Sequence, residues 1–172
     1  MHAHRKEMNM VERIRAEMAA LFDSRESKEA LAARLYAQHE KERDGFVAAF
    51  NARSESLIEP VFRAFQGTVT SKGLICYVDA QKGVYAPTRR VSAFVTFGIG
   101  ERATSLRPGT GARGNYVKVL ADTATRYVLV THVRPTAQPL DLEADGESID
   151  LSNVDEAFLH RHLAKLVKVY FD

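Results

Sequence analysis

Apolar residues in the first part of the chain recur at helical spacing. A helix is predicted from about Lys6 to Phe22, because its large apolar side chains follow at intervals of three, four and three residues: Val11, Ile14, Met18 and Leu21. This is the seam spacing of a coiled coil. Ser27 is a suitable N-cap for a second helix over residues 28–44, where strong helix formers dominate, and Gly45 suggests a break after it.

A third helical stripe runs from Phe46 to Gln66. Pro60 lies inside it and predicts either a kink or the first turn of a new helix. The next segment, GTVTSKG (67–73), either ends this helix or begins a hairpin, and its two glycines fit both interpretations.

Beyond Gly67 the pattern changes to short runs rich in Val, Tyr, Phe, Ile and Thr, separated by turn residues. Four strands are predicted, over residues 74–80, 89–99, 115–122 and 126–133. The short connections exclude most crossover helices, so we expect an antiparallel meander.

Residues 135–150 are acidic and are interpreted as a loop, with room for one short strand. Ser152 then fits the N-cap of a final helix, with Asp155 completing an approximate capping box. The apolar face of this helix is the expected cover of the sheet, and it comprises Val154, Phe158, Leu159, Leu163, Leu166, Val167 and Tyr170.

These elements predict an α+β fold: N-terminal helices that are partly coiled-coil-like, a four-stranded antiparallel sheet, and a C-terminal helix packed on that sheet. The helical region covers residues 1–66 and the sheet with its helix covers residues 67–172. At 172 residues, both regions together are expected to form one domain.

Composition is that of an ordinary globular protein, with 45% hydrophobic and 27% charged residues. No apolar run approaches the roughly 18 residues that span a bilayer, and no secretory signal is evident, so we expect a cytoplasmic protein without membrane contact. The single cysteine, Cys76, lies among apolar residues and is interpreted as an inert thiol.

Charge is distributed unevenly along the chain. Residues 67–135 contain 10 Lys or Arg and 3 Asp or Glu, whereas residues 136–172 contain 3 basic and 8 acidic residues. Residues 1–66 are balanced, with 11 of each sign. Such asymmetry bears on the choice of binding partners and not on the fold.

Gly109, Gly111 and Gly114 form a G-x-G-x-x-G sequence, the pattern of a phosphate-binding loop. A dinucleotide loop requires an apolar strand before it and a helix after it. The segment before this motif is not apolar and residues 115–122 resemble a strand, so we interpret the motif as a hairpin loop and expect no nucleotide cofactor.

The histidines and carboxylates give no catalytic or metal-binding motif. His160 and His162 are two residues apart on a predicted helix, too far around it to share a metal, and are interpreted as surface residues. His132 alternates with Val128 and Val130 and is interpreted as a core or rim residue. No residue is therefore assigned a catalytic role, and an enzyme is the less favoured class.

We expect a non-enzymatic, homo-oligomeric interaction or regulatory module whose N-terminal helices contact an unidentified protein partner or a second copy. The alternative is a nucleic-acid or polyanion binder that uses the basic sheet and the loop at residues 98–115. Its candidate binding residues are four arginines and two tyrosines that could stack on bases: Arg89, Arg90, Arg107, Arg113, Tyr116 and Tyr127. The structural alternative to that binder is that the acidic segment at residues 136–156 lies over the basic surface and neutralises it. A third class, an enzyme or small-ligand binder with a pocket under the curved sheet, has no residue in the sequence that supports it.

Overall fold

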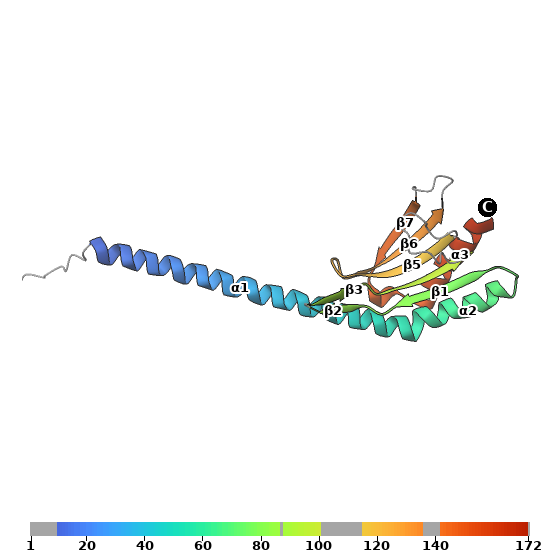
Figure 1. Ribbon diagram of the computed structural model, residues 1–172, viewed down its shortest axis with the longest axis horizontal. Helices are drawn as coiled ribbons and strands as arrows, with labels where there is room; N and C mark the ends of the chain where they lie inside the picture. The colour runs from blue at the N-terminus through green and yellow to red at the C-terminus, as the bar shows by residue number, and fades with distance from the viewer. Residues whose placement is uncertain (1–9, 87, 101–114, 136–141, 172) are drawn as a thin grey trace, which may run out of the picture. The chain divides into compact units, whose positions relative to one another are not determined.

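The computed structural model describes residues 10–86, 88–100, 115–135 and 142–171 (Figure 1). The chain divides into two units, residues 1–42 and residues 43–172, and each is described by itself. In the first unit the described residues are helical throughout and belong to α1 (Met10–Arg53), which continues into the second unit. The second unit holds every other helix and strand described below.

The predicted interruptions at residues 23–27 and at Gly45 are wrong, because α1 runs unbroken through both. One glycine costs a helix only about 1 kcal/mol relative to alanine, which neighbouring helix formers offset. The interruption occurs instead just before Pro60, where residues Ser54–Ile58 form a π-helical turn. There the N–H of Glu59 bonds the carbonyl of Ser54, five residues back. Proline lacks an N–H and crowds the preceding turn, which accounts for the change of hydrogen-bond spacing.

Residues 67–73 end a helix and do not begin a hairpin. α2 (Glu59–Thr70) is followed by a turn in which the N–H of Ser71 bonds the carbonyl of Gly67 at 3.1 Å. Gly73 closes that turn with a φ of +83°, a conformation that favours glycine at the end of a helix.

The main sheet has five antiparallel strands, not the four expected. In spatial order they are β1 (Cys76–Gln81), β4 (Phe94–Ile99), β5 (Asn115–Asp122), β6 (Tyr127–Pro135) and β7 (Leu142–Ile149). The extra strand, β7, lies within the segment interpreted as an acidic loop and pairs with β6 at the sheet edge. Its sequence has weak strand propensity, so pairing with β6 decides its conformation, and charged residues are common on edge strands.

The predicted strand over residues 89–99 is two strands. β3 (Arg89–Val91) pairs with β2 (Val84–Ala86) in a separate two-stranded sheet, and β4 begins at Phe94. In the break between them, Ala93 is 1% exposed and packs in the interior, whereas Ser92 is exposed.

α2 and α3 (Glu156–Phe171) pack on one face of the main sheet, and the C-terminal helix predicted to cover the sheet is confirmed. The sheet side of this core is formed by Val95, Phe97, Val117, Val119, Val128 and Val130.

The predicted N-cap of α3 is wrong: Asp155 caps the helix, accepting a 2.7 Å bond from the N–H of Phe158. Ser152 lies instead in a 3-10 turn, Leu151–Asn153, bonded to Asp150. Of the predicted apolar face, Tyr170 is 41% exposed and does not join the core.

Candidate functional site

A cavity of about 300 Å³ opens between the start of the second unit and its two sheets. Arg43 lines it from α1, and Tyr85 and Arg90 line it from the β2–β3 hairpin. The remaining wall comes from β3, β5 and the residues that follow them: Val91, Ser92, Ala121, Thr123 and Ala124. The described lining therefore holds two guanidinium groups and three hydroxyl groups, with small apolar side chains between them.

Tyr85 organises the two arginines of this cavity. Its ring is 8% exposed, and its hydroxyl oxygen accepts a 3.2 Å hydrogen bond from Nη1 of Arg43. Arg90 is the cross-strand partner of Tyr85, and its guanidinium carbon lies 4.9 Å from the centre of the tyrosine ring. Both positive groups are thus held against one buried aromatic side chain, which supplies a cation–π contact to Arg90.

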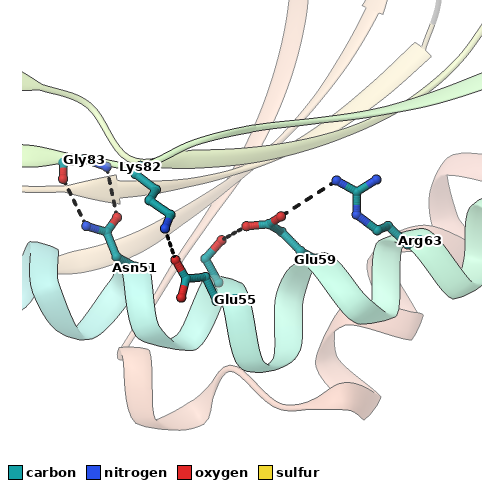
Figure 2. Close-up of polar contacts among 7 residues, drawn as sticks. Asn51, Glu55, Glu59, Arg63, Lys82 and Gly83 are labelled. Carbon is teal, nitrogen blue, oxygen red and sulfur yellow. Dashed lines mark hydrogen bonds and ion pairs between the residues drawn. The ribbon is translucent and has the colours of Figure 1, made fainter.

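The hairpin that carries Tyr85 and Arg90 is fixed to the helix by polar contacts at its start (Figure 2). The side chain of Asn51 donates to the carbonyl of Gly83 and accepts from its N–H, at 3.0 and 2.9 Å. Lys82, next to Gly83, pairs with Glu55 one helical turn further along, which raises the pKa of Lys82. The same helix face continues to Glu59, which accepts from Ser54 and faces Arg63.

The turn between β5 and β6 shapes the opposite wall. The carboxylate of Asp122 accepts bonds from the hydroxyl of Thr125 at 2.7 Å and from the N–H of Ala124 at 3.0 Å. These bonds favour the charged form and hold the pKa of Asp122 below its usual value. Arg126 completes the turn with a φ of +62°, which is unusual for a residue other than glycine.

The candidate polyanion-binding residues that the structure describes lie on two different sheets. Arg89 and Arg90 lie on β3 in the two-stranded sheet, whereas Arg107 and Arg113 lie outside the described residues, as does the G-x-G-x-x-G motif. Tyr116 and Tyr127 lie on β5 and β6 of the main sheet. β5 begins directly after the glycine motif, as expected, so a strand and not a helix follows it.

The register places both tyrosines on the sheet face opposite the helices. Tyr116 pairs with Val133 and Tyr127 with Asp122, at opposite ends of the same strand pair. Tyr127 is 47% exposed, whereas Tyr116 is half-buried, and burial raises its pKa. Among the side chains described on this face, the charged ones are Asp79, Lys118 and Asp122. This face is therefore aromatic without being basic.

Two buried histidines form a polar contact inside the core. Nε2 of His132 lies 2.8 Å from Nδ1 of His162, and the two rings stack with centres 5.1 Å apart. Nε2 of His162 lies 3.3 Å from a carboxylate oxygen of Glu147, outside hydrogen-bond geometry. Burial lowers the pKa of His162, and the attraction of Glu147 opposes that shift.

The interpretation of His162 as a surface residue is thus wrong, while His160 is exposed and His132 is buried, as expected. A sequence signal for His162 existed, because it falls on the same α3 stripe as Phe158, Leu159 and Leu163. The interpretation rested on the two-residue spacing between the histidines and not on this stripe.

In the first unit, large apolar side chains are exposed on α1. Seven of them have exposed fractions between 48% and 66%: Ile14, Met18, Leu21, Phe22, Leu31, Leu35 and Tyr36. Three of these belong to the predicted stripe that also includes Val11. Scattered exposed apolar residues are common, but seven large ones on a single helix segment are typical of an interaction surface.

Within the described parts of the chain, no three His, Cys, Asp or Glu side chains are grouped so as to hold a metal ion. No described helix combines the length and apolar character that crossing a bilayer requires. Comparison of the chain with protein families, curated proteins and solved structures found no match, so its function has to be argued from its own geometry.

Proposed function

We propose that the chain is a non-enzymatic interaction module that self-associates through α1 residues 10–42. The observation that carries the proposal is the exposure of seven large apolar side chains on this helix segment. From residue 12 to residue 39 every side chain is exposed, so no described part of the same chain covers these apolar groups. Burying them against another helix removes apolar surface from water, worth about 25 cal/mol per Å².

A second copy of the same segment is the occupant that the charges favour. Residues 10–42 contain 6 Lys or Arg and 7 Asp or Glu, with both signs interspersed. Two such helices do not repel each other through net charge, and opposite charges can meet across the contact. Ile14, Met18 and Leu21 follow the spacing of a helix-pair seam over one heptad.

Light scattering coupled to size exclusion tests this proposal. At tens of micromolar, the scale on which weak dimers persist, we expect a mass of at least twice the 19.2 kDa of one chain. Dilution should lower the average mass, because association depends on concentration. A mass of one chain across the whole range would exclude self-association.

Nucleic-acid or polyanion binding remains the second candidate. Arg89 and Arg90 are both exposed on β3, and Tyr127 offers an exposed ring for stacking. The charged side chains described on the aromatic sheet face are one basic and two acidic, so that face offers little attraction to a polyanion, and we place self-association first.

Fluorescence anisotropy with labelled single-stranded RNA, single-stranded DNA and heparin tests the second candidate. Binding through several phosphates should weaken by about one logarithmic unit per tenfold increase in salt for each phosphate neutralised. A variant with Arg89, Arg90, Arg107 and Arg113 changed to Ser should lose this binding. Equal binding by the intact chain and the variant would argue against these residues as the contact.

A further inference from the structure

We propose that the cavity between Arg43, Tyr85 and Arg90 binds a small organic anion through its carboxylate or phosphate oxygens. This site shares Arg90 with the candidate polyanion surface but differs from it in its other residues and in its ligand class. It includes Arg43, which lies in the helical part of the chain, and it excludes Arg89, the neighbour of Arg90 on β3.

The polar lining matches the chemistry of an anionic oxygen. Each guanidinium presents five N–H donors in a planar fork, so it can bind a protein oxygen and an anion at the same time. Ser92 and Thr123 add hydroxyl groups to the lining, and the described lining residues include no carboxylate. Asp122, which lies between the lining residues Ala121 and Thr123, directs its carboxylate to Ala124 and Thr125 within its own turn.

Tyr85 is the positioning residue of this site. Its hydroxyl accepts a hydrogen bond from Arg43, and its ring makes a cation–π contact with Arg90. Tyr85 itself is buried, at 8% exposed. Long arginine side chains ordinarily lose conformational entropy when they bind a ligand. Holding both against a buried ring reduces that loss, which is the structural basis of a preorganised site.

The apolar part of the lining limits the size and character of the ligand. Val91, Ala121 and Ala124 contribute short side chains, and a volume of about 300 Å³ is at the lower end of ligand pockets. We therefore expect an anionic group attached to a compact apolar body, and not a nucleotide or an extended polymer.

Isothermal titration calorimetry with inorganic phosphate, phenyl phosphate and benzoate tests the proposal on the full chain, with chloride at matched ionic strength as the blank. At least one probe should bind with a dissociation constant of about 1 mM or lower. Binding of both phosphate and phenyl phosphate would indicate a phosphate site, and binding of benzoate would indicate a carboxylate site. Stronger binding of phenyl phosphate than of phosphate would confirm the contribution of the apolar wall.

Arg43→Gln and Arg90→Gln should each weaken binding of that probe by about tenfold or more, the scale of one hydrogen bond to a charged group. Arg89→Gln is the matched control, because it removes the same charge one residue away, outside the lining, and should change affinity less than about twofold. Thermal unfolding of each variant establishes that it is folded. Absence of binding by all three probes at about 10 mM would overturn the proposal, as would equal weakening by Arg89→Gln and Arg90→Gln.

Discussion

Asn51 and Gly83 are joined by two hydrogen bonds, in which the side-chain amide of Asn51 pairs with the backbone N–H and C=O of Gly83 as a neighbouring strand would. The amide nitrogen of Asn51 donates to the carbonyl of Gly83 and its oxygen accepts from the N–H, at 3.0 and 2.9 Å (Figure 2). Gly83 is buried, so water does not readily substitute for these bonds. This pair of hydrogen bonds fixes the start of one hairpin to α1, and that hairpin carries Tyr85 and Arg90.

Asn51→Ala should lower the free energy of unfolding by about 1–3 kcal/mol, because it leaves a buried N–H and a buried C=O without their partner. Urea denaturation followed by circular dichroism measures the change. Lys82→Ala is the control, since its ion pair with Glu55 is solvent-exposed and should leave the midpoint nearly unchanged. Equal effects of the two substitutions would contradict the role given to Asn51.

Gly83→Ala and Gly45→Ala should shift stability in opposite directions. A Cβ at Gly83 would lie 2.6 Å from Cβ of Ala93 and 2.8 Å from Cγ1 of Val47, so overpacking should cost about 1–3 kcal/mol. A Cβ at Gly45 meets no described atom within 4 Å, and alanine in the exposed interior of α1 should stabilise by about 0.5–1 kcal/mol. The same denaturation assay compares them, and stabilisation by Gly83→Ala would refute the close packing.

His162 should make the chain less stable as the pH falls below about 6.5, its ordinary pKa. Burial lowers the folded-state pKa, so the unfolded chain binds more protons between the two pKa values and stability rises with pH through that window. The charged groups that influence this ring are Glu147, Arg161 and Lys165, and His132 contacts it directly.

Denaturation at pH 7.5 and pH 5.5 measures this dependence. His162→Gln should reduce the difference between the two pH values, even if it lowers stability at both. His160→Gln, on the exposed side of the same helix, should retain the full difference. An unaltered pH dependence in His162→Gln would show that other groups cause it.

Leu21→Ser combined with Leu35→Ser should abolish self-association while leaving the unit at residues 43–172 folded. Both leucines are exposed, at 66% and 49%, so their loss removes no packing within the described chain. Light scattering measures the mass, and near-ultraviolet circular dichroism of the tyrosines in the sheet reports on folding. Ala16→Ser with Ala33→Ser is the matched control, and a similar loss of mass there would indicate a general effect of added polarity on α1.

Local pattern predicted most helices and strands, but it placed breaks in α1 that do not occur, and it missed a strand that depends on residues distant in sequence. α3 was predictable because its own spacing of Phe158, Leu163 and Leu166 specifies one apolar face. β7 was not, because residues of weak strand propensity become a strand only when the edge of β6 is available to pair with them. The break before Pro60 shows the reverse case, in which a local steric rule placed the interruption correctly.

The candidate sites divide in the same way. Apolar spacing identified the exposed stripe on α1, since that feature needs one helix alone. The cavity joins Arg43 to Tyr85 across 42 positions of sequence, and the histidine contact joins His132 to His162 across 30. Neither separation leaves a periodic signal that sequence reasoning can detect.

By itself the sequence determined that helices precede an antiparallel sheet and that an apolar helix closes it, because helical and strand periodicities are local properties of neighbouring residues. The tertiary structure alone decided that Asn51 meets Gly83, that two arginines meet Tyr85, and that His162 is buried. The physical reason is that polar side chains find their partners only after the apolar core has brought distant segments together, and most buried polar groups then bond to whatever residue lies opposite.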